Sequence, residues 1–253
     1  MSENTIMNTT HPSTSFPTQS LQAPSPTRRV VDAPTRMFHW LFALCFIGAY
    51  ASADGERWRL LHVTLGYTLV GLLVFRLAYG LIGPRQVRLS QLWRKLAGLS
   101  AWLRAFRLGG TSPVNWRQGQ SLLMALAVVA LMAVVVPVAL SGYATYDDWG
   151  GEWLEELHEF SGELFLWLVL GHLALIIGLS LVRRKNQAIP MLTGRVEGTG
   201  PDLARRNHSW LAMLLLAAVL SFWAWQWQQS PNGLMAGNAS SISRDRSHDA
   251  HDD

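Results

Sequence analysis

Five long apolar runs constrain the fold of this chain more than any other feature of its sequence. They cover residues 37–53, 60–83, 121–144, 160–182 and 209–227. The hydrocarbon core of a bilayer is about 30 Å thick, and a helix that crosses it needs about 20 predominantly apolar residues. Only 15% of the residues are charged. The sequence therefore predicts an all-α integral membrane bundle, with four helices in a core and a fifth, C-terminal transmembrane helix.

The charges of the connecting segments predict the direction of the helices. Segment 84–119 holds seven basic and no acidic residues, and 183–208 holds six more basic residues, whereas 145–159 holds six acidic and no basic ones. Cytoplasmic loops of membrane proteins carry an excess of Lys and Arg. We therefore expect a multi-pass protein of the bacterial cytoplasmic (inner) membrane, with a cytoplasmic N-terminus and a periplasmic C-terminus. Because these loops hold the positive charge, we expect no nucleic-acid partner.

Segment 84–119 also has an amphipathic pattern. Apolar residues recur in it at helical spacing with Lys and Arg between them, namely Leu89, Leu92, Leu96, Leu99, Leu103 and Phe106. Such a pattern is typical of a helix that lies in the membrane surface. The alternative is a solvated linker between two membrane helices.

Four histidines belong to the predicted membrane helices. His158 and His172 are fourteen residues apart in the stretch 153–176. On one helix this spacing keeps them within about 40° of the same face and roughly 21 Å apart along the axis. In the predicted topology, His39 lies toward the cytoplasmic level of His172, and His62 lies at the outer level of His158. Ionisable groups in membrane spans indicate function by default, although a packed or interfacial histidine is the alternative.

Two imidazoles at each level form a ligand set for haem iron. Two axial histidines are a common ligation mode in electron transfer, since they leave the iron no open position for a substrate. We therefore predict an inner pair of His39 with His172 and an outer pair of His62 with His158. The single cysteine, Cys45, excludes a C-x-x-C haem attachment, so haem would be held non-covalently.

Two arginines are candidates for binding the haem propionates. Arg36 lies one turn before His39, and Arg76 lies fourteen residues after His62 at the inner level. A guanidinium group binds a carboxylate through a planar fork. The alternative for Arg76 is a side chain that reaches the inner headgroups. Four glycines would let a porphyrin approach the backbone, unless they serve close helix packing instead: Gly66, Gly71, Gly162 and Gly171.

Three stretches of the sequence resemble the prokaryotic cytochrome b561 family, which includes the b-type subunits of nickel-iron hydrogenases. They are V-V-D-A-P-T-R-M-F-H-W at 30–40, H-V-T-L-G-Y-T-L-V-G-L-L-V-F-R-L-A-Y-G-L-I-G-P-R at 62–85, and H-E-F-S-G-E-L-F-L-W-L-V-L-G-H at 158–172. The resemblance implies a membrane cytochrome of four or five helices with two b haems. It also implies that the ligands are His39, His62, His158 and His172.

The resemblance divides the chain into four parts. Residues 1–29 are expected to be a disordered cytoplasmic tail, rich in Ser, Thr and Pro, and residues 228–253 a disordered external tail. Residues 30–196 are expected to form a cytochrome b561-like, four-helix, di-haem membrane domain. Residues 197–227 would then hold a connection and the fifth transmembrane helix.

The expected function is transmembrane electron transfer in a respiratory chain. Electrons would pass between the quinone pool and a periplasmic partner, such as a c-type cytochrome or an oxidoreductase subunit, with two haems b and quinone or quinol as ligands. Quinone-linked oxidoreductase activity of its own stays open. One alternative is the membrane-anchoring subunit of a hydrogenase, although hydrogenase-type members typically have G-H-N-P where residues 110–113 read G-T-S-P.

An alternative of another class is a non-redox membrane anchor or a proton-relay transporter. An anchor gives no reason for four histidines at two matched levels. A proton relay would favour acidic residues inside the spans, where this chain has only Glu163, near the outer edge.

Overall fold

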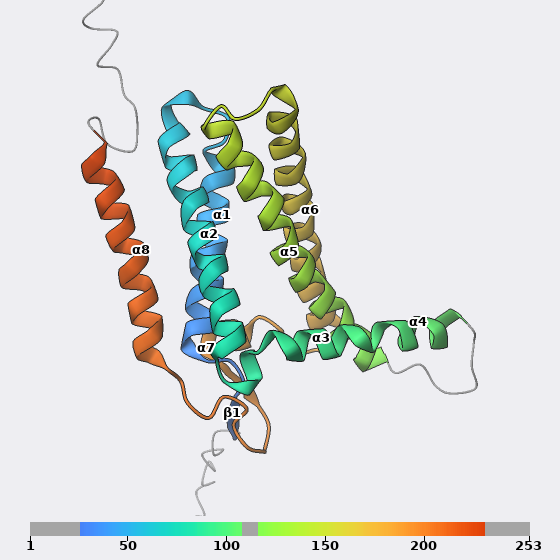
Figure 1. The fold of residues 1–253 in the computed structure, drawn as a ribbon. Coiled ribbons are helices and arrows are strands. Elements are labelled where there is room, and N and C mark those ends of the chain that lie inside the picture. The colour runs from blue at the N-terminus through green and yellow to red at the C-terminus, as the bar shows by residue number, and fades with distance from the viewer. Residues whose placement is uncertain (1–25, 108–115, 231–253) are drawn as a thin grey trace, which may run out of the picture.

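The computed structural model describes residues 26–107 and 116–230, and it is mostly helical. Figure 1 shows the long helices side by side, with α8 on one side of the α1–α2 pair and the α5–α6 pair on the other. These helices are α1 (Ala33–Ala51), α2 (Arg59–Ile82), α5 (Trp116–Tyr146), α6 (Glu152–Arg183) and α8 (Ser209–Gln229). The predicted all-α membrane bundle is thereby confirmed in its helical class, and the tails 1–25 and 231–253 lie outside the described residues.

Four helices in the described part of the chain are long and apolar enough to cross a membrane, namely α2, α5, α6 and α8. The mean hydropathy of α1 is too low for it to be counted with these four, because Arg36, His39 and Trp40 occupy its first turns. It nevertheless packs along α2 over its second half, from Leu41 in its middle to Ala49 near its end. The sequence predicted five spanning helices, and the composition of the helices supports four of them.

A buried carboxylate fixes the beginning of α1. Asp32 is the N-cap, and its Oδ1 accepts a hydrogen bond from the Thr35 backbone N–H at 3.2 Å. Its Oδ2 accepts a hydrogen bond from the Tyr79 hydroxyl of α2 at 2.6 Å, and the residue is fully buried. An N-cap satisfies backbone donors that the first helical turn leaves free. Helix α1 therefore starts four residues before its apolar run and is tied to α2 there.

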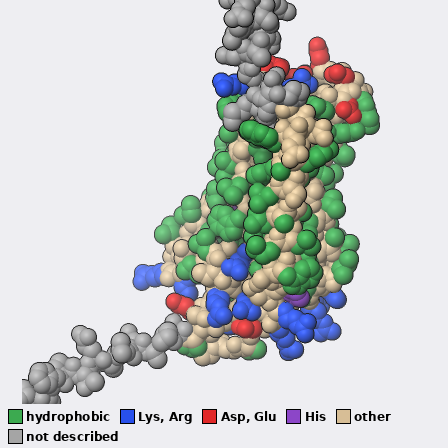
Figure 2. All heavy atoms as spheres, turned by 90° about the vertical axis from the view of Figure 1, so that its left-hand side faces the viewer, with side chains coloured by type: hydrophobic (Ala, Val, Ile, Leu, Met, Phe, Trp, Pro, Cys, Tyr) green, Lys and Arg blue, Asp and Glu red, His purple; other side chains and the backbone are tan. Residues whose placement is uncertain are grey.

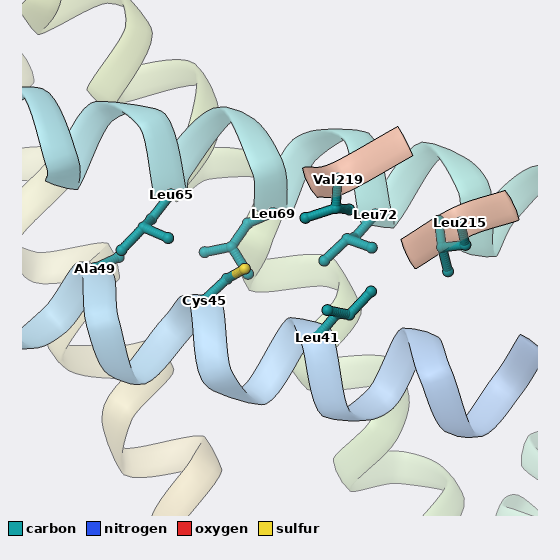
Figure 3. Close-up of a cluster of buried hydrophobic side chains, with 8 residues drawn as sticks. All are labelled: Leu41, Cys45, Ala49, Leu65, Leu69, Leu72, Leu215 and Val219. Atoms are coloured by element: carbon teal, nitrogen blue, oxygen red, sulfur yellow. The ribbon is translucent and has the colours of Figure 1, made fainter. Parts of the chain in front are cut away.

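The main hydrophobic core lies between α1, α2 and α8 (Figure 3). It comprises Leu41, Cys45 and Ala49 of α1, Leu65, Leu69 and Leu72 of α2, and Leu215 and Val219 of α8. A Cβ on Gly48 would lie 2.8 Å from Cδ1 of Leu65, so the glycine allows α1 and α2 to approach closely. The Trp223 indole N–H also donates to the Thr68 hydroxyl at 2.9 Å, which adds a polar link between α8 and α2.

The segment after α2 folds as two short helices across one end of the bundle (Figure 1). They are α3 (Leu89–Ala97) and α4 (Leu99–Arg107), with a break at Gly98, and they follow the 3-10 turn η2 (Arg85–Val87). The helical prediction for this segment is confirmed, although the sequence indicated one continuous helix. Trp93 is 76% exposed and Leu103 is 42% exposed. Exposed apolar side chains between basic ones suit a helix at a membrane surface.

A small sheet pairs the segment that precedes α1 with a segment that follows α6. Strand β1 (Thr27–Arg29) pairs antiparallel with β2 (Arg195–Glu197), which follows the short helix α7 (Ile189–Thr193). The N–H groups of Val30 and Val31 donate to the Gly194 carbonyl at 2.9 and 3.2 Å. Residues 27–29, which the sequence assigned to the N-terminal tail, are thus ordered by pairing with a segment far away in the chain.

Charge is distributed unequally between the two ends of the molecule (Figure 2). An apolar belt separates the end where α8 begins, at which Lys and Arg side chains gather, from the end where α8 finishes, at which most of the visible acidic side chains lie. At the second end, the 3-10 turn η1 (Glu56–Trp58) joins α1 to α2, and Glu152 and Glu155 occupy the first turn of α6. The arrangement suits a belt in hydrocarbon between two aqueous interfaces.

Candidate functional site

The outer histidines meet across α2 and α6. The ring centroids of His62 and His158 are 5.9 Å apart, with 84° between the ring planes. Nδ1 of His62 lies 2.8 Å from the Ala49 carbonyl oxygen, and Nδ1 of His158 lies 3.0 Å from the Val138 carbonyl oxygen. A carbonyl only accepts hydrogen bonds, so Nδ1 carries the proton in both neutral rings. The lone pair of each ring is therefore on Nε2, the nitrogen left to bind a metal.

Helix α5 holds the His158 ring although it carries no histidine itself. The Val138 carbonyl binds Nδ1, and the Ser141 hydroxyl lies 3.4 Å from the same nitrogen. A Cβ on Gly142 would lie 2.7 Å from Cε1 of His158, so only a glycine lets the ring pack this closely against the helix. These three neighbours fix the position and the tautomer of the ring. None of the three was predicted from the sequence, where small residues after Pro137 are the available signal.

The inner histidines come from α1 and α6. His39 lies close enough to His172 for an electrostatic interaction between the rings. The Nδ1 atoms of both rings are buried and have no hydrogen-bond partner among the described residues. A buried polar atom without a partner costs about 1–3 kcal/mol. Hydrogen bonds of the chain therefore fix the tautomer of the inner rings less than that of the outer rings.

The sequence predicted that His39 and His172 lie at the same depth in the membrane, and this depth depends on where α1 begins. His39 is three residues after Arg36, whereas His172 is eleven residues before Arg183, the last residue of α6. Helix α1 begins at Ala33, and α6 extends beyond its apolar run to Arg183. The early start of α1 reduces the mismatch between the two distances, whereas α6 passes its apolar run by only one residue at this end.

The two arginines predicted to bind propionates both contact backbone carbonyls. Arg36 donates from Nη1 to the Leu192 carbonyl at 3.0 Å, and its buried Nε has no partner within residues 26–107 and 116–230. Beside it, the Trp40 indole N–H donates to the Met191 carbonyl at 3.0 Å, so α7 is fixed against the first turns of α1. Arg76 donates from Nη1 to the Val87 carbonyl at 3.2 Å and interacts electrostatically with Asp32.

Aromatic side chains fill the space between the two histidine levels. Phe165 lies midway between His158 and His172 on α6 and is 3% exposed. Its ring meets Phe46 of α1 edge-on, with the centroids 4.6 Å apart, and meets Phe42 at 6.2 Å. Edge-to-face pairs at these distances are favourable. This apolar residue lies between the inner pair and the outer pair along α6.

All four glycines predicted to admit a flat ligand have open space at the position of a Cβ. Nothing lies within 4 Å of a Cβ built on any of them. Gly66 and Gly162 lie one helical turn after His62 and His158, on the same faces as these ligand candidates. Gly171 adjoins His172, whereas Gly71 lies about half a turn away from the His62 face. The two glycines of the outer level therefore fit a planar group beside the rings.

The donor set suits a haem at each level. The residues that the structure describes contain no group of three or more His, Cys, Asp or Glu side chains that would hold a metal ion. Two imidazoles are sufficient for an iron that brings four nitrogen ligands of its own. With metal–nitrogen bonds of about 2 Å, two imidazoles on one metal have centroids roughly 6 Å apart. The 5.9 Å separation of the outer rings fits this requirement.

Comparison with known proteins assigns the chain to a family. No curated protein and no solved structure matches it. The family model of prokaryotic cytochrome b561 matches residues 30–194. The two limits of this match lie side by side in the structure, because the backbone N–H groups of Val30 and Val31 donate to the carbonyl of Gly194. The chain belongs to the prokaryotic cytochrome b561 family, and it is accordingly a multi-pass membrane protein that acts in electron transfer as a b-type cytochrome.

Proposed function

We propose that this protein is a di-haem cytochrome that transfers electrons across the cytoplasmic membrane between the quinone pool and a periplasmic redox partner. The observation that carries the proposal is the outer pair, in which two rings on different helices stand 5.9 Å apart. Both rings of this pair are held by backbone carbonyls at Nδ1, which leaves Nε2 to bind iron. The inner pair, with its two unpartnered Nδ1 atoms, is the second site.

Each ligand has a defined place in this proposal. His62 and His158 hold the outer haem, and His39 and His172 hold the inner one. Arg36, whose buried Nε has no partner, offers a donor to a propionate of the inner haem. Arg76 serves the same level, although its nearest acidic group in the described structure is Asp32.

The protein contributes orientation and exclusion of water. A bound haem supplies a one-electron iron couple, and axial ligands, hydrogen bonds and burial tune such a couple. The Ala49 and Val138 carbonyls orient the outer imidazoles and raise their basicity as ligands. Phe46 and Phe165 fill the space between the levels and keep it free of water.

The orientation and the partners follow from charge. The basic segments at the α3 and α7 end belong in the cytoplasm, and the acidic connection between α5 and α6 belongs in the periplasm. In this arrangement α1 also crosses the membrane, since it packs along α2, and the helices number five. The acidic outer end attracts a basic periplasmic partner, such as a small c-type cytochrome or an oxidoreductase subunit.

The first prediction concerns haem content. The purified protein should show a b-type spectrum after reduction with dithionite, and a pyridine haemochrome assay should give about two haems per chain, because each pair of imidazoles holds one iron. A folded protein that binds no haem under adequate haem supply would exclude the redox function and favour a non-redox anchor. A ratio of about one would exclude the two-site arrangement.

The second prediction concerns the pairing of the histidines. His39→Ala and His172→Ala should lose the same haem, and His62→Ala and His158→Ala should lose the other, because each substitution removes one of two axial bonds. Each variant should keep about one haem per chain, since the sites are roughly 21 Å apart along α6. Redox titration with low-temperature spectra identifies the lost component. Grouping of His172 with His62 would contradict the proposal.

The third prediction uses the packing of α5 against the outer site. Gly142→Ala places a Cβ 2.7 Å from His158, so the ring must shift while all four ligands remain. We expect the outer haem to bind roughly 10- to 100-fold more weakly, as when other supporting contacts of metal ligands are lost. Haem titration of the apoprotein measures this change. Gly178→Ala on α6 is the matched control, since its Cβ meets nothing within 4 Å. Equal affinities in both variants would refute a role for α5 at this site.

The fourth prediction concerns orientation. Reporter fusions after Arg104 should be active only as cytoplasmic reporters, and fusions after Gly150 only as periplasmic ones, because this topology retains the basic segments inside. Alkaline phosphatase and green fluorescent protein provide the two readouts. The opposite pattern would invert the proposed direction of the bundle.

A further inference from the structure

A hollow lies at the basic end of the bundle, away from the histidine pairs. Helix α3 packs against α5 there, and residues of α3, α5 and the end of α6 line an open hollow of about 300 Å³. An adjoining hollow of about 560 Å³ shares three of its lining residues. The lining residues that matter for its chemistry are Lys95 of α3, Gln120 and Met124 of α5, Leu179 and Arg183 of α6, and Gln187.

The polar rim of this hollow carries uncompensated positive charge. Lys95 and Arg183 line it from two different helices, and none of the described lining residues is acidic. Within the described part of the chain, the one salt bridge joins Lys185 to Glu197 at 4.0 Å and involves neither of these cations. Arg183 donates from Nε to the Gln120 side chain at 2.8 Å, which orients its guanidinium group at the rim. The rim is therefore built for an anion.

The floor of the hollow is apolar. Met124, Ala125 and Val128 of α5 and Leu179 of α6 continue from the rim toward the belt of the membrane. A ligand that fits both parts has an anionic head and a hydrocarbon chain. A quinone has a neutral head group, which gives no reason for two unpaired cations. Basic pockets between membrane helices on the cytoplasmic side are suited to anionic phospholipid head groups.

We propose that this hollow binds one anionic phospholipid, with its phosphate between Lys95 and Arg183 and an acyl chain along Met124 and Leu179. The bound lipid would fasten the surface helix α3 to the α5–α6 pair through charge contacts from both. Cations that merely reach the headgroup region would not need an apolar floor shared between two helices beside them. The proposal does not depend on haem, because none of these residues is a candidate ligand.

The fifth prediction tests this site with the full-length protein in mild detergent. Phosphatidylglycerol should remain bound in native mass spectrometry and raise the melting temperature, and phosphatidylcholine should do neither. The double variant Lys95→Gln/Arg183→Gln should bind phosphatidylglycerol roughly 10- to 30-fold more weakly, since each cation near an anionic lipid contributes about 1 kcal/mol. The matched control is Arg94→Gln/Arg184→Gln, which removes the same charge from exposed neighbours outside the lining.

Several results would overturn the lipid site. Equal weakening in both double variants would indicate diffuse attraction to the basic end. Equal protection by inorganic phosphate would indicate a site for the free anion, and displacement by a short-chain quinone would indicate a quinone site. Loss of the inner haem band in the Lys95→Gln/Arg183→Gln variant would assign the cations to the propionates. Haem content and size-exclusion profiles, measured in parallel, separate these results from misfolding and from failure of the proposed electron-transfer function.

Discussion

A histidine inside an apolar bundle must find a partner for each of its two ring nitrogens, and this requirement organises the structure. At the outer level, backbone carbonyls of α1 and α5 satisfy Nδ1 of His62 and His158. Each bond comes from a helix other than the one that carries the ring. The two imidazoles therefore link α2 to α1 and α6 to α5, and the lone pair of each ring is left on Nε2. Loss of the α1 or the α5 carbonyl would leave Nδ1 of His62 or of His158 unpaired.

The same rule explains the polar residues that bind no cofactor. Asp32 is fully buried, yet it accepts from the Thr35 N–H and the Tyr79 hydroxyl, so both carboxylate oxygens have partners. Thr68 accepts from Trp223 and donates within its own helix. Such contacts attach α1 and α8 to α2 by fixed polar links, where hydrophobic packing alone does not specify position along the helix.

Much of the fold could be predicted from the sequence, because apolar runs, sign-segregated loops and histidine spacing are local signals. The helices at 59–82, 152–183 and 209–229 and the cross-helix approach of His62 to His158 follow directly from them. The supporting residues could not be predicted. Val138 acts through a carbonyl that every residue has, and Gly142 acts by lacking a side chain, so neither has a chemical signature. Strand β1 pairs with residues far away in the chain, which local composition does not record.

The two histidine pairs differ in what holds them, and this difference has a physical consequence. The outer rings are fixed by the chain itself, since both Nδ1 atoms have carbonyl partners in the structure. The inner rings have buried Nδ1 atoms for which the described residues offer no partner, so hydrogen bonds of the chain do not fix their tautomer or orientation. Where a preformed site is incomplete, binding of the metal contributes to folding. If the inner pair holds a haem as proposed, ordering of the inner end, where α7 closes over Arg36 and Trp40, should be coupled more strongly to cofactor binding than ordering of the outer end.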